Sequence, residues 1–382
     1  MPKRQRLSRN FALPNSAETS STLALRMGGM RALRARGAAT MMMRKLTRRD
    51  FVKSGAAALA ASGLPLIGVA RGAGNLDSVN MQLGWITGGN QLGEVVAKRL
   101  GYFKEANIDF AIQAGGPNID GVAIVASGRY EVGQLSSSPS LLLAASQGLP
   151  VTCFAVGAQE HPYAYFSLPA APIRKPRDMI GRKIGIQATG AVLLSALLRK
   201  NGVPEDKVEK VIVGADMTPL LTGQVDAFAG WITNTTALKP LGPDVVKMRL
   251  WDCGVKLYAL PYYATTDTIA NKADVLARFL KAAARGWIFA RANPEKAVDL
   301  LVQEYPNLVQ ADELVAAPIM FSFEFTPRTA AYGWGGFDPQ VWQDQIDLYD
   351  QLKQFPAGKP KLDAVMTTKI LEMTAADRPK IG

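Results

Sequence analysis

The sequence predicts an α/β protein with two domains. Short apolar segments are followed by segments with apolar residues at helical spacing, and loops rich in Gly, Pro and Ser separate them. This alternation is typical of a parallel sheet covered by helices. About 310 residues follow the N-terminal region described below, which is more than one hydrophobic core usually accommodates, so we expect two domains.

The first unit of this pattern covers roughly residues 80–156. Strands are predicted at 80–86, 108–113, 130–134 and 151–156, and helices at 92–100, 119–127 and 140–147. Gly101 and Gly148 stand at the ends of two of these helices, where glycine commonly terminates a helix.

A second unit begins after the proline-rich link at 169–176. Strands are predicted at 183–187, 208–213 and 227–231, an extended segment at 257–265, and helices at 191–201 and 218–222. From Asp274 onward the pattern is mostly helical, with segments at 275–291, 294–305, 312–320 and 339–354.

The N-terminal region contains an export signal. Residues 47–53 read TRRDFVK and precede a weakly apolar run at 54–69, which is the twin-arginine (Tat) export pattern. The run is too short to span a bilayer, and small residues follow it, so we expect cleavage within 70–74 and a protein that works in the periplasm. Residues 1–40 fit no fold; a start codon assigned too far upstream or an unusually long basic n-region would explain them, and we favour the first.

The net charge of +12 is concentrated in this leader. Residues 1–53 contain 13 of the 44 basic residues and two of the 32 acidic ones, which leaves 31 basic and 30 acidic residues for the rest. The remainder therefore has no electrostatic reason to bind nucleic acid.

Cysteine and histidine usage excludes several classes of chemistry. Cys153 and Cys253 both lie in strand-like apolar segments, so we expect two separate buried thiols rather than a disulfide, and no metal site. His161 is the only histidine, and it lacks a G-x-S-x-G partner; beside Pro162 it is interpreted as a hinge or surface residue. No phosphate-binding glycine motif is present, and no cofactor is predicted.

Several short motifs, in this order, carry a family resemblance. They are Gly84-Trp85, VVAKRLGYF at 95–103, GQVDA at 223–227, Gly286-Trp287 with ANPEKA at 292–297, and FDPQVW at 337–342. Together they resemble the type II solute-binding proteins of ABC importers over about residues 79–355. Within these, the chain looks most like the group related to binding of thiamine-pyrimidine precursors, which grades into nitrate, taurine and alkanesulfonate receptors.

The resemblance implies two lobes that close on a ligand. Lobe one would comprise 74–160 and 265–382, and lobe two 166–260, with hinge crossings at 159–162 and 262–264. It further implies a monomeric receptor, not an enzyme, with two partners: a small-molecule solute and an ABC permease of the inner membrane. The Tat export machinery would be a third, transient partner.

Candidate ligand contacts follow from the rule that ligands bind outside the carboxyl ends of strands. Lobe one offers Trp85, Asn90 and Gln91 after its first strand, and Ser136, Ser137 and Ser138 at a helix N-terminus; lobe two offers Thr189 and Gly190. Trp85 could equally cap the core, and the serines could act as N-caps. Because no Arg or Lys accompanies these helix ends, we expect a neutral or weakly charged ring compound.

Lobe two and the hinges complete the set. Trp231 and Asn234 lie at and just after the end of a strand, and the resemblance implies an asparagine at this point; Thr235 and Thr236 replace an acid that relatives often carry. The resemblance also implies a ligand-facing aromatic residue at the position of Trp85. Trp231 opposite Trp85 would form an aromatic sandwich. Glu160 is a candidate acceptor for an exocyclic amine, and Tyr262 a further aromatic candidate.

Two alternatives remain open. One is a receptor for alkanesulfonate, taurine or nitrate. The other is a pyrimidine-forming enzyme with the same fold, although the eukaryotic enzymes of this kind carry a clustered-cysteine motif that this chain lacks.

Overall fold

The computed structural model describes residues 76–116 and 119–381, and these form one compact unit. The twin-arginine motif, the apolar run, the predicted cleavage segment and residues 1–40 lie outside the described residues. Their predicted roles therefore stay predictions.

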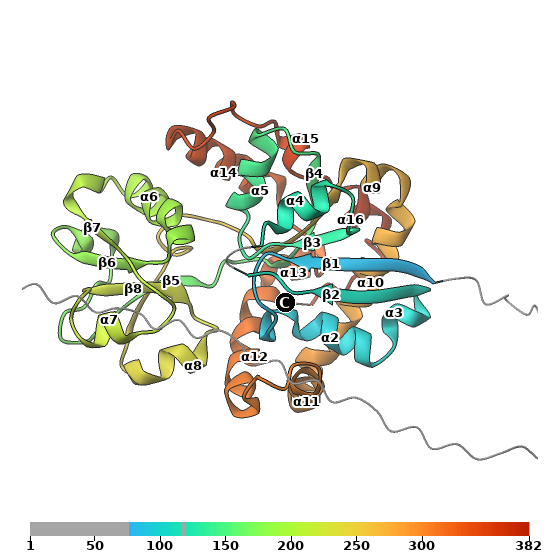
Figure 1. Ribbon diagram of the computed structural model, residues 1–382, viewed down its shortest axis with the longest axis horizontal. Helices are drawn as coiled ribbons and strands as arrows, with labels where there is room; N and C mark the ends of the chain where they lie inside the picture. Colours follow the sequence, from blue (N-terminus) through green and yellow to red (C-terminus); the bar gives the residue numbers. More distant parts are fainter. Residues whose placement is uncertain (1–75, 117–118, 382) are drawn as a thin grey trace, which may run out of the picture. The chain divides into compact units, whose positions relative to one another are not determined.

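The first sheet contains five strands in the order β2-β1-β3-β10-β4 (Figure 1). These are β1 (Asp77–Leu83), β2 (Ile108–Gln113), β3 (Val132–Gln134), β4 (Val151–Ala158) and β10 (Ala259–Thr265). β1 is parallel to β2 and β3, whereas β10 is antiparallel to both β3 and β4. Every residue of β4 and β10 is buried, as expected for strands covered on both faces.

The second sheet repeats this arrangement in the order β7-β6-β8-β5-β9. It contains β5 (Tyr163–Ser167), β6 (Lys183–Ile186), β7 (Glu209–Ile212), β8 (Ala227–Trp231) and β9 (Val246–Arg249). β5 is antiparallel to both of its neighbours. The α/β class and the two lobes are thus confirmed, but each sheet is mixed rather than purely parallel, because the strand that follows each crossing runs against its neighbours.

The chain passes between the sheets twice. Residues 159–162 connect β4 to β5, as predicted, and residues 250–258 connect β9 back to β10. The second predicted crossing, at 262–264, was wrong, because these residues lie inside β10 and pair with β3 and β4. β5 was also missed, since its five buried residues precede the link at 169–176 where the second unit was expected to start.

Helices cover both sheets, and five single 3₁₀ turns punctuate the loops of the described chain. The helices are α2 (Leu92–Arg99), α3 (Tyr102–Glu105), α4 (Gly121–Ala126), α5 (Pro139–Ser146), α6 (Ala191–Lys200), α7 (Thr218–Leu221), α8 (Thr235–Leu238), α9 (Thr266–Asn271), α10 (Ala273–Ala292), α11 (Pro294–Glu304), α12 (Gln310–Glu324), α13 (Pro327–Tyr332), α14 (Pro339–Gln351), α15 (Leu362–Val365) and α16 (Lys369–Met373). The turns are η1 (Gly89–Gln91), η2 (Pro176–Met179), η3 (Ala188–Gly190), η4 (Glu205–Lys207) and η5 (Lys239–Leu241).

Helices α2 and α10 pack unusually closely beside the first sheet (Figure 1). A Cβ at Gly286 would overlap the carbonyl oxygen of Gly93, and a Cβ at Gly93 would overlap the buried indole of Trp287. The two glycines therefore set the separation of these helices. Both cysteine thiols are free, as expected, but only Cys153 is buried; Cys253, also expected to be buried, is half-buried because it lies in the turn after β9 rather than in a strand.

Candidate functional site

Strand pairing brings the candidate loops of both lobes to the first crossing. In the first sheet, Ala259 pairs with Ala158 at the end of β4 and forms a bridge with Ser137 in the loop after β3. In the second sheet, Trp231 at the end of β8 pairs with Tyr163, the first residue of β5. The carboxyl ends of β3, β4 and β8 thus meet around residues 159–162.

His161 stands at the centre of this meeting point. Its side chain is fully buried and its Nε2 lies 2.5 Å from the Ser137 hydroxyl oxygen of lobe one. Its ring also contacts Trp231 of lobe two edge to face, with 5.2 Å between centroids. The imidazole therefore connects two predicted ligand-binding residues that are far apart in the sequence.

The hydrogen bonds of His161 define its tautomer. The backbone N–H of Tyr163 donates to Nδ1 at 3.2 Å, so Nδ1 carries the lone pair and the neutral ring carries its proton on Nε2. Burial lowers the pKa of His161 to about 3, which keeps the ring neutral near pH 7. Nε2–H consequently donates to the Ser137 oxygen.

This arrangement determines what Ser137 can do. A histidine that activates a serine nucleophile must face the hydroxyl with an unprotonated nitrogen, and here the facing nitrogen is protonated. The Ser137 oxygen is an acceptor toward His161, so its own proton is available to donate to another group. The pair is suited to holding an acceptor atom of a ligand.

Lobe two contributes a further aromatic residue, Tyr163, beside His161. Tyr163 packs edge to face against His161, and its hydroxyl lies against Gly190, where a Cβ would overlap it. The buried hydroxyls of Tyr163 and Thr233 have no hydrogen-bond partner in the described structure. Buried polar groups are normally paired, so both hydroxyls lack a partner that such groups usually have.

Other predicted residues line the surface near the strand ends. Trp85 leaves 43% of its surface exposed, so it does not cap the core. Thr189 and Asn234 are exposed, and Asn90 and Ser136 are half-buried. The ring contacts found within the described chain do not include Trp85 with Trp231, so the predicted sandwich is not formed in this structure.

Three predicted residues lie inside lobe one instead. Ser138 is buried and donates to the side chain of Gln345 at 2.6 Å. Gln91 donates to Gln134 at 2.8 Å, and Gln134 and the buried Tyr262 hydroxyl both donate to Glu94. Gln91 and Tyr262 thus belong to one internal polar network through Gln134 and Glu94, and Ser138 belongs to a separate buried pair. In each case the local backbone turns the side chain toward the core rather than toward the strand-end surface. Burial also raises the pKa of Glu94 to about 7.

Glu160 is already neutralised. Its carboxylate forms an ion pair with Arg249 at 2.5 Å, and the Arg249 guanidinium lies 5.1 Å from the ring centroid of Phe323. Because Arg249 belongs to β9 and Phe323 to α12, this contact joins the two lobes. Glu160 is therefore placed as part of the hinge.

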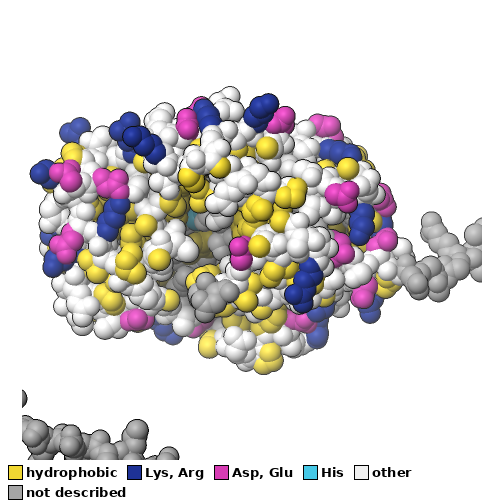
Figure 2. Space-filling model, turned by 45° about the horizontal axis from the view of Figure 1, so that its top comes forward, with side chains coloured by type: hydrophobic (Ala, Val, Ile, Leu, Met, Phe, Trp, Pro, Cys, Tyr) yellow, Lys and Arg dark blue, Asp and Glu magenta, His cyan; other side chains and the backbone are white. Residues whose placement is uncertain are grey.

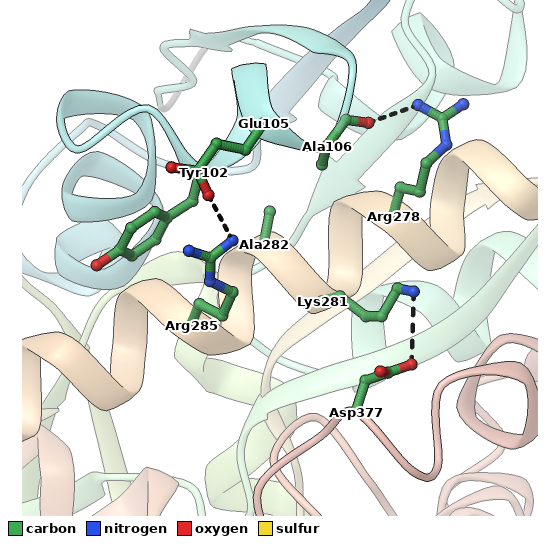
Figure 3. A pocket seen from close by; sticks show the side chains of 8 residues that line it. All are labelled: Tyr102, Glu105, Ala106, Arg278, Lys281, Ala282, Arg285 and Asp377. Carbon is green, nitrogen blue, oxygen red and sulfur yellow. Dashed lines mark hydrogen bonds and ion pairs between the residues drawn. The ribbon is translucent and has the colours of Figure 1, made fainter. Parts of the chain in front are cut away.

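Charged side chains of both signs are spread over the viewed face of the molecule (Figure 2). Figure 2 shows a hollow near the middle of the viewed face and basic and acidic side chains interspersed around it. A separate cavity of about 410 Å³ lies between α3 and α10, where Arg285 pairs with Glu105 at 2.9 Å and Lys281 lies 3.4 Å from Asp377 (Figure 3). Its charged groups satisfy one another, so we do not assign the function to it.

None of the described helices is long and apolar enough to cross a membrane. Across residues 76–116 and 119–381, no group of three or more potential metal-ligating side chains is present.

Sequence reasoning interpreted His161 as a hinge or surface residue; it lies in the first crossing, but it is buried rather than on the surface. Tyr163 was considered only as an aromatic residue that packs more often than it contacts a ligand. A lone histidine has no spacing signal, and Tyr163 belongs to the strand that was not predicted. The proline after His161, which marks the crossing, is the signal that could have drawn attention to both.

The chain is similar in sequence to proteins of one known family. The NMT1/THI5-like family model matches residues 89–297. The formylaminopyrimidine-binding protein of Halalkalibacterium halodurans is 26% identical over 292 residues, covering 73% of this chain and 87% of that protein. The 4-amino-5-hydroxymethyl-2-methylpyrimidine phosphate synthase of Legionella pneumophila is 25% identical over 236 residues, covering 60% and 74%.

Solved structures show the same fold. The periplasmic aliphatic sulphonate binding protein SsuA from Escherichia coli superposes with a TM-score of 0.58 at 16% identity, over 78% of this chain and 99% of that one. At this identity the similarity concerns the fold alone. The chain therefore belongs to the NMT1/THI5-like family and has the fold of periplasmic solute-binding proteins.

Proposed function

We propose that this protein is the periplasmic solute-binding component of an ABC importer and that it binds a planar heterocycle between its lobes. The observation that favours this is the contact of Ser137, His161 and Trp231, which joins both lobes at the crossing. A ligand held there contacts both lobes at once, and closure is driven by contacts that are better in the closed state.

The chemistry of the proposed site suits a ring compound. Trp231 and the exposed Trp85 offer aromatic faces from opposite lobes, and Ser137 offers a hydrogen-bond donor. Arg249, which lies beside the first crossing, is paired with Glu160, so it is not free to act as a bidentate partner for a sulfonate or nitrate. The pyrimidine-binding relative has a ligand of the expected kind.

A binding role is also favoured over catalysis. In the proposed site the only histidine faces Ser137 with a protonated nitrogen, so this pair lacks the base that a serine nucleophile requires. We therefore expect the bound compound to be released unchanged, delivered to a permease by a chain that the Tat pathway exports.

The test is a ligand screen by thermal shift, followed by calorimetry, with aminopyrimidines, flavins, alkanesulfonates, taurine and nitrate. A ligand at 100 times its Kd adds about 2.7 kcal/mol of stability. Trp231→Ala should weaken binding of a ring compound by about 1–3 kcal/mol, because stacking on an aromatic side chain is lost. Tyr332→Ala, which removes an exposed aromatic from α13, is the matched control.

Three outcomes contradict the proposal. They are stabilisation by sulfonates or nitrate alone, equal binding by Trp231→Ala and the wild type, and conversion of the bound compound when the complex is analysed by mass spectrometry.

A further inference from the structure

Glu313 is a half-buried carboxylate that no other residue neutralises. It lies in the first turn of α12, and its side chain has no hydrogen bond or ion pair with the rest of the described chain. A Cβ at Gly89 would overlap Glu313 Oε2, so the carboxylate rests directly on the loop that follows Trp85. The absence of a side chain at Gly89 makes room for it.

The residue beside it shows that this turn of α12 faces lobe two. Asp312 accepts a hydrogen bond from the Thr236 hydroxyl at 2.7 Å, its backbone oxygen accepts one from Thr235 at 3.1 Å, and Lys239 lies 3.8 Å from its carboxylate. These partners belong to α8 and η5, which lie beside α12 in Figure 1. Asp312 is thus occupied by lobe two, and Glu313 is left free at the boundary between the lobes.

An unpaired carboxylate in this position is unfavourable without a donor. Burial and the neighbouring Asp312 both raise the pKa of Glu313, which shows that its charged form lacks compensating contacts. An N–H group of a ligand would supply the missing hydrogen bond. Glu160, the acid expected from the sequence to play this role, is instead neutralised by Arg249.

We infer that Glu313, seated on Gly89 at the lobe boundary, selects ring compounds that carry an amino group over those with an oxo group in its place. This rests on the proposed function and narrows its ligand class. The amino group donates to the carboxylate, whereas an oxo group would place two acceptors against each other.

The experiment compares two probes by calorimetry at pH 8: 4-amino-5-hydroxymethyl-2-methylpyrimidine and its 4-oxo counterpart. The wild type should bind the amino compound at least about 10-fold more tightly, since a hydrogen bond to a charged group has about that effect. Glu313→Gln, whose amide both accepts and donates, should reduce this ratio to within about threefold. Glu295→Gln removes one exposed acid from α11 and is the charge control.

A second variant keeps the test informative if Glu313→Gln folds poorly. Gly89→Ala keeps Glu313 but displaces its carboxylate from the loop. This variant should therefore also reduce the ratio between the affinities for the amino and oxo compounds. An unchanged ratio in both variants overturns the inference while the proposed function stands, as does a ratio that collapses only in Glu160→Gln. Failure of the wild type to bind any ring compound, with binding of a sulfonate instead, refutes the proposed function itself.

Discussion

At the residue scale, His161 has different partners on its two ring nitrogens. Nδ1 accepts from the Tyr163 backbone, and Nε2 faces Ser137. Protonation of the ring would place a proton on Nδ1 against the Tyr163 N–H and would bury a charge, so both effects oppose it. The hydrogen bonds and the burial thus favour the same neutral form.

Because His161 is the only histidine, this can be measured directly. A long-range ¹H–¹⁵N spectrum of the protein without a histidine tag should show one neutral imidazole, protonated on Nε2. Its signals should not move between pH 8 and pH 5, since burial lowers its pKa to about 3. A titration midpoint near the ordinary value of about 6.5 would contradict the described site.

The residue scale also shows what the sequence could indicate about the site. Ser137 and Trp231 were selected because they lie at or just after the end of a predicted strand, and their roles stay predictions. Gln91 and Ser138 were selected by the same reasoning and Tyr262 as an aromatic residue at a predicted crossing, yet all three are buried, because position along a strand or turn does not determine which way a side chain points. Glu313 gave no signal, since its place depends on a glycine more than 200 residues away.

At the element scale, the contact of α2 with α10 is the most demanding packing in lobe one. Ala is a better helix former than Gly by about 1 kcal/mol, so Gly286→Ala would stabilise an isolated α10. In the protein, the added methyl would overlap backbone atoms of Gly93, which cannot move without displacing α2.

We therefore expect Gly286→Ala to lower the free energy of unfolding by about 1–3 kcal/mol. Urea unfolding followed by circular dichroism measures this. Gly88→Ala is the control, because a Cβ at Gly88 meets no atom within 4 Å. A Gly286→Ala protein as stable as the wild type would mean that the two helices are further apart than described.

Most elements could be predicted from local patterns, but their pairing could not. The segment 257–265 was correctly expected to be extended, since it is continuously apolar. Its location between β3 and β4 depends on contacts with strands more than 100 residues earlier in the sequence, for which hydrophobic periodicity has no signal. The second crossing was misplaced for this reason.

At the scale of the whole molecule, Asp312 forms a contact between the lobes that is separate from the two crossings. The hydroxyls of Thr235 and Thr236 reach it from α8, and these contacts exist only when α8 and α12 are close together. Removing them favours conformations in which the two helices are apart.

Thr236→Val should therefore weaken binding of every ligand by a similar factor, about two- to fivefold, because a partly exposed hydrogen bond contributes about 1 kcal/mol or less. Calorimetry with the amino and oxo probes measures this loss of affinity. The ratio between the probes should stay at its wild-type value, in contrast to Glu313→Gln. A selective loss of one probe would show that Thr236 contacts the ligand instead.

The position of β10 also has a consequence for the order in which the chain can fold during synthesis. The strands of the second sheet lie within residues 163–249, so that sheet can assemble as soon as this stretch has left the ribosome. The first sheet starts earlier in the sequence but must keep a gap between β3 and β4 until residue 265 emerges. Until then β3 and β4 expose unpaired edges, which makes the nascent N-terminal half the part of this protein most in need of a chaperone.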